Sequence, residues 1–455
     1  MRQTGFLLLC LLVLAGFVAA QGGDLEERVS RLESQLVAID RAVGEAADET
    51  ASPSDLRVYW KEALRIETVD GAFKFRIGGR MHNDWIFVLR DGDERPSNRM
   101  SQSLGSIDEP NTRVLFRRAR LYLSGTIYED LDFAFQYDFA GGDGAFKDVY
   151  LALKNIPVVG RVQVGQFKEP FSLEELTSSN HITFMERSVA NAFVPSRSTG
   201  LMISSHFEKI VTWAAGVFRD SDDWGDDDYS EQDGSDWAFT ARATVCPVQD
   251  DEGKIVVHLG LAASHRNPND DEVRISSRPE IRSKYSAVDT RLRYGPGPGD
   301  FWDVTAEAVN LVGAEAAVVL GPFSAQAEYI LAVIDEHQVH STNPRYYGWY
   351  VQASGFVTGE SRRYNGEKGA FDRVRPRRSL GEDGGFGAIE LAARVSQIDL
   401  NDRAMPWDGG KMLSFTLGAN WYLNPNARVM LNWVRADRDR AEPSGFFGVR
   451  FQVDF

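Results

Sequence analysis

Arginine residues recur at even spacings in two segments of this chain. Arg76 and Arg80 lie four residues apart, and Arg118 and Arg120 lie two residues apart. Residues separated by an even number share one face of a β-strand, so each pair would present both guanidinium groups to the same side. A guanidinium fork binds phosphate through two parallel hydrogen bonds. These four residues are therefore candidates for binding a small oxyanion.

A second group of basic and hydroxyl side chains lies in residues 165–188. Lys168 and Arg187 stand near the two ends of this segment, and Ser178 and Ser179 lie between them. Lysine contributes a point charge to an anion, and serine hydroxyls can donate hydrogen bonds to it. We predict that these four residues complete an anion-binding constriction with the arginines.

The same basic residues have a second interpretation. Inward-facing arginines of a channel can instead pair with the carboxylates of a loop and hold that loop in place. Four glutamates are available for such pairing: Glu169, Glu174, Glu175 and Glu186. Both interpretations are consistent with the sequence.

From residue 71 onward, apolar and polar side chains alternate with a period of two. Phe73 and Phe75 share one face of the first such segment, and Lys74 and Arg76 share the other. Segments of about 10 residues with this alternation, separated by Gly, Asp and Asn turns, are typical of transmembrane β-barrels. A soluble β-sandwich alternates too, but the segments here are numerous and long, with aromatic apolar faces.

We therefore predict an all-β fold over residues 71–455, an antiparallel transmembrane β-barrel of about 16 strands, with about 18 as the alternative. Barrels of this size leave a water-filled channel, into which both arginine pairs would point. The outward apolar faces would contact outer-membrane lipid. The chain ends on Phe455 in strand phase, which resembles the signal that the outer-membrane insertion machinery reads.

The connection that follows the strand ending near Lys168 is unusually long. Proline cannot donate to a strand ladder, so Pro170 ends the strand pattern. Ser172 and Glu175 have capping-box spacing, which predicts one short helical turn. The next strand begins near Gly200, so the connection spans about 30 residues, whereas hairpin loops have about 2–5. Its apolar content favours packing, and we predict that it folds into the barrel and narrows the bore.

The first residues of the chain resemble an export signal. Residues 1–20 combine Arg2, an apolar run and a small-residue ending, which predicts a signal peptide removed before Gln21. The alternative is a retained membrane anchor, for which the run is short. Cys10 lies within this segment, so Cys246 would be the single cysteine of the mature chain and no intramolecular disulfide is expected.

Residues 24–43 carry a different period. Apolar residues alternate at spacings of four and three, which predicts a coiled coil that joins two, three or four copies of the chain. A single amphipathic helix is the alternative. Residues 44–70 have the composition of a linker.

Several motifs together resemble one known family, the phosphate-selective porins O and P of bacterial outer membranes. No single motif is sufficient, but their combination covers the whole barrel. They are residues 165–188 (GQFKEPFSLEELTSSNHITFMERS), 116–121 (FRRARL), 321–329, 348–354 (GWYVQAS), 358–362 (TGESR) and 420–426 (NWYLNPN). The resemblance implies a trimeric porin of sixteen strands whose third external loop folds inward. It also implies that basic residues conduct phosphate or polyphosphate.

Composition adds limits to this interpretation. The net charge of −16 would repel anions at long range. However, the acidic run 220–236 and the polar stretch 267–280 are expected as external loops, where salt screens their charge within about 8 Å. The seven histidines and the remaining residues form no catalytic or metal-binding motif, so we expect no enzyme activity, metal or cofactor. No nucleic-acid partner is expected.

The leading functional hypothesis is an outer-membrane channel for inorganic phosphate or other small anions. A general porin, or one for another solute on the same scaffold, is the first alternative. A second alternative, of another class, is an envelope tether in which residues 24–43 bind the cell wall and the barrel serves as an anchor.

Overall fold

A computed structural model describes most of the region expected to form the barrel. The described residues are 52, 55–90, 112–142, 144–220, 237–250, 253–268, 272–283, 286–293, 301–302, 304–335, 343–403, 408–439 and 441–455. The signal peptide expected at 1–20, the coiled coil expected at 24–43 and nearly all of the acidic run 220–236 lie outside these residues.

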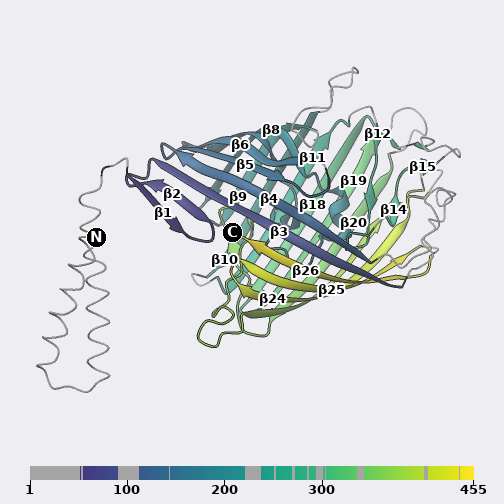
Figure 1. The fold of residues 1–455 in the computed structure, drawn as a ribbon. Coiled ribbons are helices and arrows are strands. Elements are labelled where there is room, and N and C mark those ends of the chain that lie inside the picture. The colour runs from purple at the N-terminus through teal and green to yellow at the C-terminus, as the bar shows by residue number, and fades with distance from the viewer. Residues whose placement is uncertain are drawn as a thin grey trace, which may run out of the picture. The chain divides into compact units, whose positions relative to one another are not determined.

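Sixteen of the described strands form one closed antiparallel barrel (Figure 1). They are β3 (Phe73–Arg90), β4 (Arg113–Ile127), β5 (Leu131–Asp138), β6 (Ala145–Ile156), β7 (Gly160–Lys168), β8 (Arg197–Phe207), β9 (Val211–Arg219), β10 (Trp237–Gln249), β11 (Ile255–Arg266), β18 (Ala308–Leu320), β19 (Phe323–Asp335), β20 (Arg345–Phe356), β23 (Ala388–Asp399), β24 (Lys411–Asn424), β25 (Ala427–Arg438) and β26 (Ser444–Asp454). Each strand pairs with the next, and β26 closes the barrel on β3, with Val449 opposite Trp85. The prediction of an all-β barrel of about 16 strands is confirmed.

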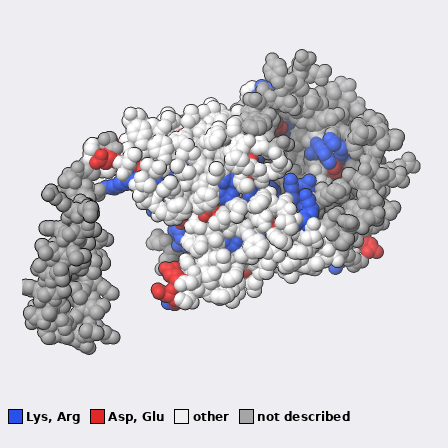
Figure 2. Space-filling view, in the orientation of Figure 1, with Lys and Arg blue, Asp and Glu red and all other residues white. Residues whose placement is uncertain are grey.

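The alternation seen in the sequence is the alternation of the barrel wall. In β3, Ile77, Met81 and Trp85 are exposed on the outside, whereas His82 and Asp84 are buried on the inside. Figure 2 shows one face of the molecule, on which uncharged residues cover most of the barrel wall. A wall that is apolar outside and polar inside is suited to lipid on one side and water on the other. Within the described residues, no helix has the length and apolar character needed to span a lipid bilayer.

The other described elements are short. They are β1 (Leu56–Trp60), β2 (Leu64–Thr68), β12 (Glu272–Val273), β13 (Ser276–Ser277), β14 (Val288–Asp289), β15 (Leu292–Arg293), β16 (Phe301–Trp302), β17 (Val304–Thr305), β21 (Tyr364–Asn365), β22 (Ala370–Phe371), helix α3 (Leu173–Leu176) and the 3₁₀-helix η2 (Val189–Phe193). β1 and β2 pair with each other within 44–70, the segment expected to be a linker. Their sequences, LRVYW and LRIET, alternate as strands do, a signal that the linker-like composition of the preceding residues concealed.

Residues 169–196 connect β7 to β8 and pack against inward-facing side chains of the barrel. Phe171 and Phe193 from this segment share an apolar cluster with Ala332 of β19 and Tyr350 of β20. A Cβ atom added at Gly348 of β20 would lie 2.9 Å from the Cα of Ala190, so glycine is what permits this close approach. Apolar packing therefore holds the segment against the wall, as its composition indicated.

A second long connection, residues 267–307 between β11 and β18, also contributes a buried residue. Glu280 is 2% exposed and contacts β23 and β24. The polar stretch 267–280 was expected to be an external loop, so its last residue departs from that expectation. The reason is that Glu280 meets a buried arginine, Arg394, whose position the sequence does not reveal.

Candidate functional site

The short helix α3 begins the part of residues 169–196 that carries charge. Ser172 caps it, because the Ser172 hydroxyl accepts a hydrogen bond from the N–H of Glu175 at 3.1 Å, which confirms the predicted helical turn. The carboxylate of Glu328 on β19 accepts the N–H groups of Leu173 at 3.1 Å and Glu174 at 2.7 Å. The helix is thereby fixed to the opposite part of the barrel wall.

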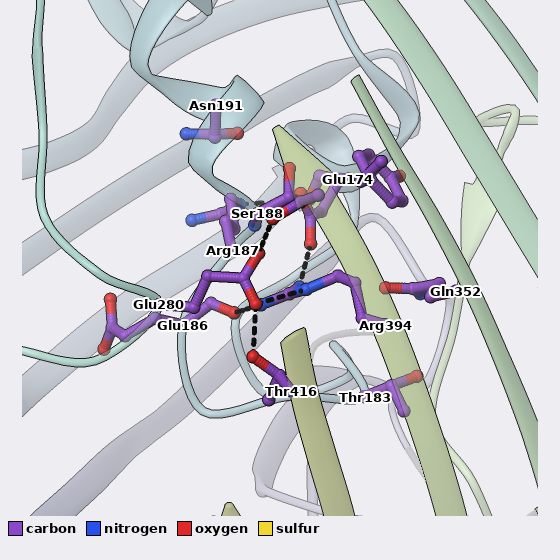
Figure 3. Close-up of polar contacts among 12 residues, drawn as sticks. Glu174, Thr183, Glu186, Arg187, Ser188, Asn191, Glu280, Gln352, Arg394 and Thr416 are labelled. Atoms are coloured by element: carbon purple, nitrogen blue, oxygen red, sulfur yellow. Dashed lines mark hydrogen bonds and ion pairs between the residues drawn. The ribbon is translucent and has the colours of Figure 1, made fainter. Parts of the chain in front are cut away.

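Wall arginines hold this segment through its carboxylates (Figure 3). Arg394 of β23 pairs with Glu174 at 2.9 Å and with Glu280 at 2.8 Å. Arg450 of β26 pairs with Glu186 at 2.8 Å, and its side chain is fully buried. Two connections that are far apart in the sequence therefore share one arginine.

The predicted site residues Lys168, Arg187 and Arg120 are each paired with a carboxylate. Lys168 and Arg187 both contact Glu175, at 3.1 Å and 3.0 Å. Arg120 contacts Asp138 of β5 at 2.6 Å. Their charges are largely compensated, so this geometry matches the second interpretation of the basic residues, in which carboxylates hold the loop.

The electrostatics of the segment follow from these pairs. Burial would raise the pKa of the Glu175 carboxyl, but Arg187 and Lys168 outweigh it and lower that pKa to about 2. Burial likewise opposes ionisation of Glu186, yet Arg117 and Arg450 hold its pKa well below the usual range. Glu174 differs, because burial raises its pKa and Arg394 only partly offsets the effect.

Arg80 is held by uncharged groups. Its Nη1 donates to the hydroxyls of Ser179 at 3.0 Å and Ser178 at 3.4 Å. The structure thus brings Arg80 together with both predicted serines, which act here as acceptors for the arginine.

Arg118 and Arg76 are also held by uncharged groups. Arg118 is 4% exposed and contacts the imidazole of His82, while Arg76 lies over the ring of Tyr122. Among the described residues, no carboxylate pairs with Arg76, Arg80 or Arg118, and the Nε atom of each is buried without a hydrogen-bond partner. These three arginines retain both charge and donor capacity.

Comparison with known proteins places this site in a family. The model of the family described as phosphate-selective porin O and P matches residues 101–455. The chain belongs to this family. It is an outer-membrane porin.

The individual relatives share about a quarter of their aligned residues with this chain. Porin O of Pseudomonas aeruginosa is 26% identical over 424 residues, which cover 87% of this chain and 90% of Porin O. An uncharacterized protein of Caulobacter vibrioides is 27% identical over 435 residues, which cover 91% of this chain and 80% of that protein.

Solved structures show the same fold. OmpT, an outer membrane protein of Vibrio cholerae, superposes with a TM-score of 0.52 at 11% identity, covering 84% of this porin and 98% of OmpT. The outer membrane channel DcaP of Acinetobacter baumannii gives 0.51 at 12% identity, with coverage of 84% and 98%.

Arg117 is an inward-facing residue that strict alternation of the sequence did not predict. The register between β3 and β4 shifts at this point, where His82 is opposite Arg118 and Asn83 is opposite Phe116. The bulge lets Arg117 turn inward beside Arg118, and Arg117 pairs with Glu186 at 2.8 Å. The sequence FRRAR, with three arginines in five residues, is the signal that could have indicated such a bulge.

The porin also has a second long connection whose buried contacts the sequence did not reveal. Residues 357–387 connect β20 to β23 at the barrel end opposite to that of residues 169–196, as the strand order requires. Tyr364 contacts the buried His258 of β11 at 2.7 Å, and the N–H of Phe371 donates to the Thr177 hydroxyl at 3.4 Å. The two segments therefore contact each other. The length of residues 357–387 was the available signal of this packing, since the other connections at that end of the barrel are short.

Proposed function

We propose that this porin conducts anions, with inorganic phosphate or polyphosphate as the preferred class. The observation that carries the proposal is the set formed by Arg76, Arg80 and Arg118. All three lie on inward-facing positions of β3 and β4, keep an uncompensated charge and have an unpartnered buried Nε atom. A partly dehydrated oxyanion passing these strands would meet positive charge that no paired carboxylate cancels.

The remaining predicted residues take a supporting part in the proposal. Lys168, Arg187 and Arg120 add little net charge, because Glu175 and Asp138 compensate them. Their contribution is to fix residues 169–196, which we propose set the width of the bore. Ser178 and Ser179 orient Arg80 within it.

Preference for phosphate over chloride follows from the shape of the donors. Arginine presents N–H groups in a planar fork that matches two oxygens of one phosphate. Chloride is a single spherical ion and cannot accept these two parallel hydrogen bonds on separate oxygens. The family description, phosphate-selective porin O and P, supports the same preference.

The total charge of the porin does not oppose this proposal. A charge of −16 is distributed over the whole chain, and much of it is paired or lies in the acidic run 220–236. Fields from exposed charges are screened within about 8 Å at physiological salt, whereas groups buried along the bore are screened much less. The residues that line the passage therefore decide its selectivity.

Assembly and targeting complete the proposal. The porin would be exported by the signal peptide at 1–20, would contact outer-membrane lipid through its apolar wall and would form a homotrimer with help from the coiled coil at 24–43. Binding of that segment to the cell wall remains a hypothesis.

Competition between phosphate and chloride in planar bilayers tests the proposal. We expect micromolar to millimolar phosphate to reduce chloride current through the wild-type porin, and Arg118→Gln to weaken this block by about tenfold, which corresponds to about 1.4 kcal/mol. Arg435→Gln is the matched control, because Arg435 is an arginine on β25 with half of its side chain exposed. If phosphate leaves the chloride current unchanged, the porin is general and the phosphate assignment is lost.

A further inference from the structure

His82 lies opposite Arg118 and two residues after Arg80 on the same face of β3, but it is not one of the expected site residues. It is fully buried on the inward face of β3, opposite Gln452 of β26 on one side and Arg118 of β4 on the other. The Nδ1 atom of His82 is 3.4 Å from Arg118 Nη1, and its Nε2 atom is 3.0 Å from the Oδ1 atom of Asn180 in the inward segment.

These two contacts define the protonation of the imidazole. A guanidinium has donors and no acceptor, so Nδ1 of His82 must accept from Arg118 and cannot carry a proton. The ring proton then lies on Nε2, where it donates to the amide oxygen of Asn180. In this arrangement His82 is neutral, and it holds Arg118 without adding negative charge.

The neighbouring rows of the wall contain carboxylates. One row places Asp454 opposite Arg80, Arg80 opposite Arg120, and Arg120 opposite Asp138. The row on the other side places Arg450 opposite Asp84, and these two form a buried ion pair at 2.6 Å. The row that contains His82 lies between them and presents Gln452, His82 and Arg118, with no carboxylate.

We propose that His82 is the positioning residue that holds Arg118 through an uncharged acceptor, and that this sets the charge selectivity of the bore. The inference rests on the proposed anion channel and deepens it. A carboxylate at the position of His82 would also orient Arg118, but it would cancel the charge as Asp138 does for Arg120.

Asn180 extends this arrangement to the inward segment. Its side chain accepts from His82, and its backbone carbonyl accepts from the Nε2 atom of Gln452 at 3.1 Å. The position of residues 169–196 and the orientation of Arg118 are therefore linked through one imidazole.

An isosteric pair of variants separates charge from structure. His82→Asp and His82→Asn have side chains of the same size, so packing differences between them are small. We expect His82→Asp to lower the anion-to-cation permeability ratio by about tenfold, because the new carboxylate is in ion-pair range of Arg118. His82→Asn offers a neutral acceptor with a shorter reach, so it should retain anion preference while weakening block by phosphate about threefold.

The permeability ratio is obtained from zero-current potentials in a salt gradient, after correct assembly of each variant has been checked by its heat-modified gel shift. Equal ratios in the Asp and Asn variants would overturn the role of His82. A cation-selective wild-type porin would instead overturn the proposed function itself, so the two failures are distinguishable.

Asn180→Asp provides an independent test if neither His82 variant assembles. A carboxylate at this position favours a protonated imidazole, whose Nδ1–H would repel Arg118. We expect the permeability ratio to fall in Asn180→Asp by more than in Asn180→Ser, which lacks the charge. Identical ratios in these two variants would reject the link between His82 and Arg118.

Discussion

At the scale of single residues, the inward-facing arginines divide according to the partner that holds each one. Arg394 and Arg450 are buried and paired with carboxylates, so they hold residues 169–196 to the wall. Arg80 and Arg118 are held by hydroxyl and imidazole groups and keep their charge. In the proposed function, one residue type thus serves both structure and conduction, and the partner decides which.

Removing a structural arginine should cost much more stability than removing an outward one. Arg394→Met leaves Glu174 and Glu280 buried without their shared cation, and we expect a loss of about 3–5 kcal/mol in the free energy of unfolding. The exposed Arg435, as Arg435→Met, is the control and should lose about 1 kcal/mol or less. Urea titration of the folded porin in detergent micelles measures both values. Similar losses in the two variants would contradict the anchoring role of Arg394.

The pKa of Glu175 predicts how this anchoring depends on pH. Its carboxyl has a pKa of about 2 in the folded porin, against an ordinary value of 4.5, so its contribution is complete above pH 4.5 and is lost as the pH falls toward 2. The difference corresponds to about 3 kcal/mol. We therefore expect Glu175→Gln to be less stable than wild type at pH 6 and the two to converge near pH 2.

Unfolding temperatures in an acid-stable detergent, recorded from pH 7 to pH 2, measure that convergence. A gap between wild type and Glu175→Gln that stays constant over the whole range would show that ionisation of Glu175 contributes nothing.

The sequence predicted the inward direction of Arg76, Arg80, Arg118 and Arg120 because strand alternation is a local property. It could not assign their partners. Glu174 and Arg394, for example, are separated by 220 residues, and only the closed barrel brings them within 2.9 Å. One interpretation of the sequence paired carboxylates of the loop with inward-facing arginines, but which arginine each carboxylate contacts depends on strand register.

At the scale of elements, two long connections and one bulge position the site. The packing of residues 169–196 was predictable from its length and apolar content, and its helical turn from Ser172 and Glu175. The inward direction of Arg117 was not, because a bulge adds a residue where strict alternation places the side chain outside. The segment 357–387 has no apolar run, so its inward position depends on contacts such as Tyr364 with His258.

Close packing between η2 and β20 gives a test of the inward segment. A Cβ atom at Gly348 would lie 2.9 Å from the Cα of Ala190 and 3.0 Å from the Phe193 ring, so Gly348→Val must displace η2. We expect a larger single-channel conductance and weaker anion preference. Gly355→Val, on the same strand, meets only the Phe323 side chain and should leave conductance unchanged. Unaltered conductance in Gly348→Val would show that the segment does not limit the bore.

At the scale of the whole molecule, fold and selectivity have different determinants. Alternation and turn residues were sufficient to predict a barrel, because closure satisfies every backbone group of a sheet in lipid. Selectivity, as we propose it, depends on a few uncompensated charges inside that barrel, while the chain as a whole is strongly acidic. On this proposal, net charge is a poor guide to what the porin conducts.

The sign of the zero-current potential across a planar bilayer tests the central claim most directly. With purified wild-type porin and a tenfold potassium chloride gradient, uncompensated Arg76, Arg80 and Arg118 should make chloride the more permeant ion. The potential should then have the anion-selective sign and move toward zero in Arg80→Gln and Arg118→Gln. A cation-selective sign in the wild-type porin would contradict the account.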